Sequence, residues 1–206
     1  MQFKYIDLTH TFTNNMPFYP GDTKPEIVQT VSFKEHGFNC FKINTGFHVG
    51  THMDAPLHML ENGKKLSEFA PDRFFGKGHL IDARERPISA ELLESKNISA
   101  GDIILIMTGF DKYFYQDIYY KSFPKMTENF ARKLAELKVG IVGMDTPSPD
   151  DYPFSLHRIL MSKDILIIEN LTNLQSLENC EDFTVIALPA KYEAEAAPVR
   201  VIAQIR

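Results

Sequence analysis

The side chains best suited to chemistry in this sequence lie close together between residues 48 and 58. They follow the pattern H-x3-H-x-D-x3-H, which is formed by His48, His52, Asp54 and His58. Neutral imidazole and carboxylate groups are ligands that zinc, manganese and iron accept in proteins. The segment itself contains no cysteine, which argues against a closed structural zinc site made of thiolates. It therefore predicts a divalent-metal site of the open, catalytic kind.

The backbone of this segment must bend if these side chains are to share an ion. Alternate residues from 48 to 58 would lie on one face of an extended chain. In a fully extended strand, however, His48 and His52 would be separated by roughly 13 Å, whereas metal–ligand bonds are about 2 Å long. Gly50 permits a bend, and Gly50, Thr51 and Pro56 together disfavour a regular helix. We expect a strand that ends in a tight turn.

Most isolated polar residues in the chain do not indicate a site. A lone histidine or aspartate in a loop is usually a hydrogen-bonded or solvated side chain, and the sequence identifies no partner for His10, His36 or His79. Asp22 and Asp145 lie in turn motifs and are expected to brace loops. The four potential metal ligands within eleven positions differ from these isolated residues, because burying so many polar groups without a partner would cost free energy. Their clustering therefore indicates a site.

Further motifs are spread along the whole chain. They are Asp7-Leu8-Thr9-His10, Met16-Pro17, Tyr19-Pro20-Gly21-Asp22, Gly101-Asp102, Thr108-Gly109-Phe110, Gly143-Met144-Asp145-Thr146-Pro147-Ser148, His157-Arg158-Ile159-Leu160, Glu169-Asn170-Leu171, Ala187-Leu188-Pro189 and Pro198-Val199-Arg200. Together with HVGTHMDAPLHM at residues 48–59, these motifs resemble the metal-dependent cyclase family. This family includes the bacterial arylformamidases, or kynurenine formamidases, and the isatin hydrolases.

The resemblance implies a site for one or two divalent metal ions. One ion would be held by His48, His52 and Asp54, and a second by Asp54, His157 and Glu169, so that the aspartate bridges the two. Zinc is the expected metal and manganese the alternative. The residues themselves do not choose between zinc, manganese and iron, because mixed nitrogen and oxygen ligands suit all three.

His157 and Glu169 would not have been chosen without the resemblance. Glu169 follows an apolar run and is predicted at the C-terminal end of a buried strand, a position from which α/β enzymes commonly project functional groups. The alternative is a solvated carboxylate at a strand end. For His157 the alternative is a histidine on a helix surface.

The resemblance also implies that His58 is the catalytic histidine. An unperturbed pKa near 6.5 lets a histidine gain and lose a proton at physiological pH, so His58 would act first as a base and then as an acid. Two other roles stay open for His58, namely a fourth metal ligand and a group that orients a ligand.

The expected reaction is the hydrolysis of a small amide, formamide or cyclic amide. Bound divalent ions lower the pKa of a coordinated water and polarise a carbonyl group. A metal-dependent cyclase or lyase acting on a carbonyl compound is one alternative, and a non-catalytic protein that binds a metal or small molecule is another.

Phe12, Phe18 and Tyr19 could form the wall of a pocket for a flat aryl group, although core packing explains them equally well. The segment before Pro198 departs from the glycine-rich stretch of many relatives, so its loop is expected to differ in shape from theirs.

Length and composition predict one domain over residues 1–206. The chain has 44% hydrophobic residues and no repeat or linker that divides it. A net charge of -5 with interspersed signs predicts a small-molecule substrate and no nucleic-acid or membrane partner. No signal segment or long apolar run stands out, so we expect a cytoplasmic protein. Cys40 and Cys180 lack metal-binding or redox spacing and are expected to be ordinary buried thiols.

The rest of the sequence alternates between strand and helix patterns. β-branched runs predict strands at residues 3–8, 26–33, 40–48, 78–83, 103–107, 140–144, 165–169, 184–188 and 199–205. The clearest helix is expected from Thr127 to Val139, with Thr127 as its N-cap and Gly140 as its stop. Others should start near Ser89 and Ser155. The mixture implies an α/β domain, and the resemblance implies a swivelling β/β/α fold with a mixed central sheet, as a homodimer or higher homo-oligomer.

Overall fold

The computed structural model describes residues 2–205 and is built on a mixed sheet that closes into a barrel. The strand order around the barrel is β10-β4-β8-β7-β6-β5-β9, and pairing of β9 with β10 closes the ring of seven strands. The strands from β5 to β8 are parallel, the other pairings are antiparallel, and β1 adds to β10 outside the ring. The bounds are β1 Lys4–Asp7, β4 His52–Asp54, β5 Phe75–Asp82, β6 Ile103–Met107, β7 Ile141–Met144, β8 Leu166–Glu169, β9 Phe183–Pro189 and β10 Ala196–Ile205.

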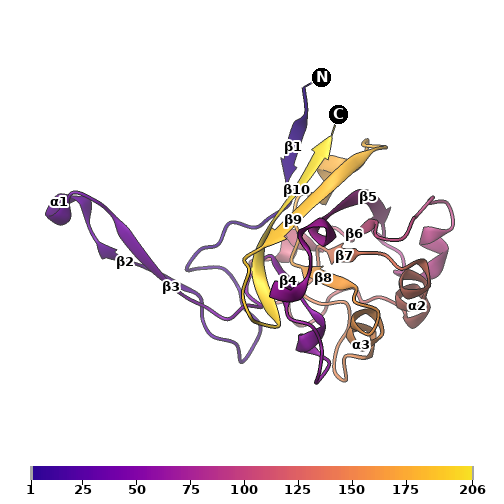
Figure 1. Cartoon of the computed structure of the whole chain (residues 1–206), viewed down its shortest axis with the longest axis horizontal. Helices are drawn as coiled ribbons and strands as arrows, with labels where there is room; N and C mark the ends of the chain where they lie inside the picture. Colours follow the sequence, from indigo (N-terminus) through magenta and orange to yellow (C-terminus); the bar gives the residue numbers. More distant parts are fainter. Residues whose placement is uncertain (1, 206) are drawn as a thin grey trace.

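Two hydrophobic layers result from the alternation of side chains along the parallel strands. On β6, Ile103, Leu105 and Met107 belong to a cluster shared by strands all around the ring, which places it inside the barrel. Ile104 and Ile106 belong to a second cluster formed with α2 (Glu128–Leu137) and α3 (Ser155–Met161). Both helices lie on the same side of the barrel, next to β6, β7 and β8 (Figure 1). Coverage of both faces explains why these strands are apolar throughout rather than alternating.

The predicted α/β fold with a mixed sheet is confirmed, with two corrections to its helices. α2 begins after Thr127 as predicted, but it ends at Leu137, because Lys138 takes the left-handed conformation (φ 55°) in place of the expected stop at Gly140. Near Ser89 the chain forms only the short 3₁₀ helix η4 (Ala90–Leu93). The strand predictions agree to within a few residues, except that the short strand β4 was not expected as a separate element.

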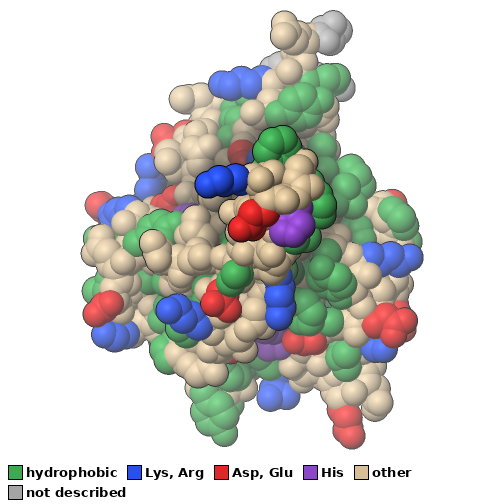
Figure 2. Space-filling model, turned by 90° about the vertical axis from the view of Figure 1, so that its left-hand side faces the viewer, with side chains coloured by type: hydrophobic (Ala, Val, Ile, Leu, Met, Phe, Trp, Pro, Cys, Tyr) green, Lys and Arg blue, Asp and Glu red, His purple; other side chains and the backbone are tan. Residues whose placement is uncertain are grey.

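A two-stranded arm projects from the barrel. It consists of β2 (Glu26–Val31), the one-turn helix α1 (Phe33–His36) and β3 (Cys40–Asn44), and β2 pairs only with β3 among the described strands. Figure 1 shows that the arm points away from the rest of the chain, and Figure 2 shows its tip end-on, with charged and hydrophobic side chains mixed. Phe41 and Ile43 on β3 remain 59% and 56% exposed, respectively. Cys40 also lies on the arm and is exposed, so the expectation of a buried thiol is wrong there.

A separate aromatic cluster packs beside the segment that carries His48. It contains Met16, Val49, Phe110, Phe114, Tyr119 and Phe123, with Phe12, Phe18, Tyr113 and Tyr120 packed against them. His10 stacks on Phe114 with the two ring centroids 3.7 Å apart, and its backbone N–H donates to the Thr51 hydroxyl oxygen. Burial lowers the pKa of His10 to about 4, so the ring is neutral at physiological pH.

This buried histidine predicts a loss of stability in mild acid. Unfolded chains take up a proton on His10 near pH 6.5, whereas the folded protein resists protonation until about pH 4. The free energy of unfolding should therefore fall by as much as about 3 kcal/mol as the pH drops through this window. Replacing His10 with Gln should remove that part of the slope in chemical denaturation, whereas replacing the exposed His36 should leave it. Equal slopes for wild type and His10→Gln would contradict the assignment.

Candidate metal centre

The segment that carries the predicted ligands bends first and then extends. Gly50 has φ +69°, a conformation that residues with a side chain rarely adopt, and this bend precedes the short strand β4. The 3₁₀ helix η1 (Pro56–His58) then turns the chain back and carries His58. The expected bend at Gly50 is thus present, although the extended part follows the bend instead of leading into it.

Strand pairing brings distant residues beside β4. His52 lies directly opposite Glu169, the last residue of β8, in the antiparallel pairing of β4 with β8. Residues opposite one another in such a pair project their side chains to the same face. The Nε2 atom of His52 lies 3.3 Å from Glu169 Oε2 and 3.5 Å from Asp54 Oδ1. Together, His52, Asp54 and Glu169 offer ligand atoms that all lie within 4.8 Å of one another.

His157 approaches the same carboxylate from α3. Its Nε2 atom lies 3.4 Å from Glu169 Oε1, and its Nδ1 atom lies 2.5 Å from Asp150 Oδ1. Asp150 also accepts a hydrogen bond from the backbone N–H of Leu156, so it holds both the ring and the start of the helix. The pairing with Asp150 leaves Nε2 of His157 directed at the cluster.

His48 and His58 form the more open side of the cluster. His48 Nδ1 lies 3.0 Å from Asp54 Oδ1, and the rings of His48 and His58 are 4.2 Å apart. The ring of His58 is also 5.9 Å from that of His157. A second group of ligand atoms within 4.8 Å of one another is therefore formed by His48, Asp54 and His58. All six residues singled out from the sequence lie together, but this grouping places His58 with the potential ligands.

Three residues around the centre were missed at the sequence level. Asp150 positions His157, as described above. The Asn170 amide donates to Gly50 O, the same carbonyl that lies 2.8 Å from His52 Nδ1, so that Asn170 fixes the bend behind that ring. Glu195 Oε1 lies 3.6 Å from His48 Nε2. Glu195 belongs to the segment before Pro198, whose sequence differs from the glycine-rich stretch of many relatives. This difference was the only feature of the sequence that could have drawn attention to Glu195.

The centre is deeply buried and rich in charge. Asp54 is 0% exposed and His52 1% exposed. His52 Nε2 and both carboxylate oxygens of Asp54 are buried and have no hydrogen-bond partner of good geometry among residues 2–205. Buried polar atoms are normally paired, because an unpaired one costs about 1–3 kcal/mol. A divalent cation would satisfy these three atoms, so the residues present fit such an ion.

Electrostatics holds the cluster together through opposite charges. Burial opposes protonation of His48 and His157, yet nearby carboxylates, chiefly Asp54 for His48 and Asp150 with Glu169 for His157, raise the pKa of each to about 9. Burial also favours neutral carboxyl groups, but the histidines lower the pKa of Asp54 and of Glu169. Both acids are therefore ionised and able to act as ligands.

His58 behaves differently from the other histidines. Burial lowers its pKa, with the positive charges of His48 and His157 acting in the same direction and only Asp54 and Glu169 opposing them. The ring is thus neutral at physiological pH and can accept a proton, which is what a general base requires.

Comparison with known proteins places the chain in a family. The family model named Cyclase ("Putative cyclase") matches residues 6–151. An uncharacterized protein of Methanocaldococcus jannaschii is 36% identical over 201 residues, which cover 96% of this chain and 97% of that protein. This chain belongs to the cyclase family.

Other relatives of this cyclase-family chain carry hydrolase names. A kynurenine formamidase of Bacillus cereus is 29% identical over 205 residues, covering 97% of this chain and 96% of that protein. A structure described as a predicted metal-dependent hydrolase from Bacillus stearothermophilus matches with a TM-score of 0.80 and 26% identity over 100% of both chains. Isatin hydrolase A from Ralstonia solanacearum shares the fold, with a TM-score of 0.88 at 20% identity over 99% of this chain and 92% of that one.

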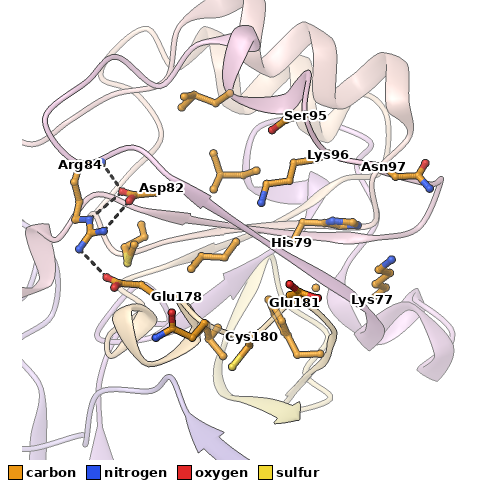
Figure 3. A pocket seen from close by; sticks show the side chains of 18 of the residues that line it. Lys77, His79, Asp82, Arg84, Ser95, Lys96, Asn97, Glu178, Cys180 and Glu181 are labelled. Atoms are coloured by element: carbon orange, nitrogen blue, oxygen red, sulfur yellow. Dashed lines mark hydrogen bonds and ion pairs between the residues drawn. The ribbon is translucent and has the colours of Figure 1, made fainter. Parts of the chain in front are cut away.

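A pocket of about 930 Å³ lies elsewhere, at the edge of β5 (Figure 3). It is lined by residues of β5 and by the stretches around Lys96 and Cys180, and it contains none of the predicted ligands. On its wall, His79 Nε2 lies 2.7 Å from Asp102 Oδ2, which supplies the partner that the sequence did not reveal.

None of the helices in residues 2–205 combines the length and apolar character needed to cross a membrane.

Replacing Asp54 should test the centre as a metal site. An Asp54→Asn variant loses one carboxylate charge at the point where both groups of ligand atoms meet, so its affinity for zinc should fall on the order of 100-fold. Calorimetric titration of the metal-free protein would measure the change. The exposed Asp72 provides the control, since Asp72→Asn should bind the metal like wild type. Unchanged binding by a folded Asp54→Asn variant would show that the cluster holds no ion.

Proposed function

We propose that this protein is a divalent-metal-dependent hydrolase of a small amide, formamide or cyclic amide, similar in activity to the arylformamidases. The observation that carries the proposal is the set of buried, unpaired ligand atoms on His52 and Asp54 beside Glu169, with the neutral His58 at its edge. Relatives named kynurenine formamidase and a structure described as a metal-dependent hydrolase support the reaction class. The cation is proposed to be zinc, with manganese as the alternative.

We assign the ligands by combining the geometry with the family resemblance. His48, His52 and Asp54 would hold one ion and Asp54, His157 and Glu169 a second, with Asp54 shared. The short distances of His48 and His52 to Asp54 support the first set, and that of His157 to Glu169 supports the second. The competing arrangement places His58 with His48 and Asp54 around one ion. Removing His58 separates the two, because only the competing arrangement loses a ligand.

The proton transfers are assigned to His58. When bound, the cation supplies a Lewis acid that polarises the substrate carbonyl and makes water more acidic. His58 takes a proton from the attacking water, whose oxygen adds to the carbonyl carbon. The C–N bond then breaks, and His58 returns the proton to the departing nitrogen. The products are an acid and an amine, so one water is consumed and His58 ends as it began.

The substrate proposed is an aryl amide or formamide. Aromatic side chains gather on the side of the centre that holds Val49, next to His48. Phe12 and Phe18, which the sequence indicated as pocket walls, pack against this cluster, and the half-exposed Tyr19 lies edge-on to Tyr120. Flat rings favour such surroundings. Kynurenine formamidase and isatin hydrolase are the names of relatives, and both support an aryl substrate for this chain.

A cyclase is the second candidate function, favoured by one structural relative described as a potential metal-dependent hydrolase with cyclase activity, at 26% identity and a TM-score of 0.80. The two reactions differ in the fate of water. Turnover in water labelled with oxygen-18 should place the label in the acid product if the enzyme is a hydrolase. A product free of label would favour the cyclase.

Activity and metal content together test the proposed function. Wild-type protein should hydrolyse an aryl formamide, lose this activity to a chelator, and regain it with zinc or manganese. A His58→Ala variant should keep the bound metal but lose about 10²–10⁴-fold in turnover, because it lacks the proton carrier. A variant of the remote His79, His79→Gln, is the control and should retain both. Inactivity of the metal-loaded wild type on all aryl formamides and cyclic amides would refute the proposal, and loss of metal from His58→Ala would instead make His58 a ligand.

We also propose that the protein forms a homo-oligomer through its arm. On one face of the hairpin, Ile27 lies opposite Ile43, and Phe41 lies opposite Gln29. Phe41 and Ile43 are each more than half exposed. A two-stranded hairpin is marginally stable by itself in water, so an apolar face on an arm needs a covering surface. A second copy of the chain is the proposed partner, because closed dimers are the commonest assemblies of soluble chains.

A charge placed on this apolar face should dissociate the assembly. An Ile43→Glu variant should sediment as a monomer at concentrations where wild type is a dimer or larger, since the buried carboxylate would lack a partner. Val28 is also exposed but lies on the opposite face, so Val28→Glu is a matched control that should leave the assembly intact. A monomeric wild type, or equal effects of both variants, would rule out this interface.

A further inference from the structure

Two adjacent tyrosines of the aromatic cluster, Tyr119 and Tyr120, have hydroxyl groups with different surroundings. The Tyr119 hydroxyl donates a hydrogen bond to Asn170 Oδ1 at 2.9 Å, and Tyr119 is fully buried. Asn170 directly follows Glu169 and holds the Gly50 carbonyl behind His52. Tyr119 is thereby explained as a structural support of the centre.

Tyr120 has no such structural explanation. Its ring meets Tyr119 edge-on at 5.2 Å and Tyr19 edge-on at 5.7 Å. Tyr119 is fully buried and Tyr19 is 46% exposed, so Tyr120 lies between the interior and the surface. Its hydroxyl oxygen is buried but has no hydrogen-bond partner among residues 2–205. A buried hydroxyl without a partner is unusual in a folded protein and points to a ligand that completes it.

Packing places Tyr120 beside the metal centre, because it contacts the aromatic cluster that contains Val49, the residue after His48. Burial raises the pKa of Tyr120, and the negative charges of Glu169 and Asp22 raise it further. Glu169 is one of the three residues whose ligand atoms lie together in the metal centre. The hydroxyl of Tyr120 is therefore a protonated donor, and it has no hydrogen-bond partner among residues 2–205.

We propose that the Tyr120 hydroxyl is a catalytic group that donates a hydrogen bond to the oxygen of the scissile carbonyl. This inference rests on the proposed hydrolase function. As the oxygen of water adds to the carbonyl carbon, the electron pair of the C=O π bond moves onto the carbonyl oxygen, which becomes negative. When the C–N bond breaks, that pair returns to form the carbonyl of the acid. A fixed donor that is already oriented stabilises the negative charge without reorganisation.

Removing only the hydroxyl tests this role. A Tyr120→Phe variant keeps the ring between Tyr19 and Tyr119, so thermal stability and metal content should match wild type. Turnover of an aryl formamide should fall 10- to 1000-fold, while KM changes by less than about threefold, because the bond strengthens in the transition state. Tyr5 on β1 is 59% exposed and lies outside the aromatic cluster and the metal centre. Tyr5→Phe is the control and should stay within about twofold of wild type.

A binding measurement gives a readout independent of turnover. An aryl phosphonamidate carries a tetrahedral, negatively charged group in place of the scissile carbonyl, whereas an aryl carboxylate resembles the product. Calorimetry should show that Tyr120→Phe weakens binding of the phosphonamidate by about the same factor as turnover, with little change for the carboxylate. Tyr5→Phe should bind both like wild type.

Each contrary outcome has a distinct meaning. Unchanged turnover, or a rise in KM alone, overturns the role of Tyr120 while leaving the hydrolase function intact. Loss of metal or of thermal stability in Tyr120→Phe overturns it in favour of a structural role. Wild type that is inactive on every aryl formamide and cyclic amide overturns the proposed function, and the role of Tyr120 with it.

Discussion

The interaction on which this structure depends is that of Asp54 with the histidines around it. A fully buried carboxylate without a hydrogen-bond donor is very costly to fold, since taking a charge out of water requires a compensating charge. Here the compensation comes from the imidazole groups of His48 and His52. Although burial opposes protonation of His48, Asp54 in turn raises the pKa of that histidine to about 9. A cation bound at this point would take over that role and release the protons.

The barrel is what makes such a concentration of charge stable. β4 lies between β10 and β8, so the backbone of His52 to Asp54 is held by pairing on both edges. The parallel strands end together, and the residue that closes β8 is Glu169. Apolar side chains fill the barrel interior and the layer beneath α2 and α3. Because these surroundings are closely packed, the fold itself holds the ligand atoms in place and limits the other contacts that the polar groups could make.

The structural features that could be predicted from the sequence are those with a local sequence pattern. The nine predicted strands and α2 follow from runs of β-branched residues and from a helical repeat, and most lie within a few residues of their predicted bounds. The bend at Gly50 also followed from local chemistry, because only a glycine adopts φ +69° without strain. Lys138 shows the limit: its left-handed conformation closes α2 before the expected glycine, and no propensity favours lysine there.

The metal centre was harder to predict from the sequence, because its residues come together only through contacts between distant parts of the chain. His48, His52, Asp54 and His58 were visible as a dense local pattern, whereas His157 and Glu169 required the family resemblance. The partners that orient them, Asp150, Asn170 and Glu195, gave no metal-ligand pattern of their own. The sequence of the arm predicts an ordinary pair of strands. It does not indicate that the apolar face of this pair stays exposed, because a strand pattern does not say which face is covered.

The most direct test of the account is to locate a bound cation. Crystals of the protein grown or soaked with zinc or manganese should give an anomalous difference peak within about 2–2.5 Å of a ring nitrogen of His48, a ring nitrogen of His52 and an oxygen of Asp54. A second peak at the same distance from ligand atoms of Asp54, His157 and Glu169 would define a two-ion centre. If the metal is absent from this cluster, or binds only at surface residues, the buried carboxylate has another purpose and the proposed chemistry is wrong.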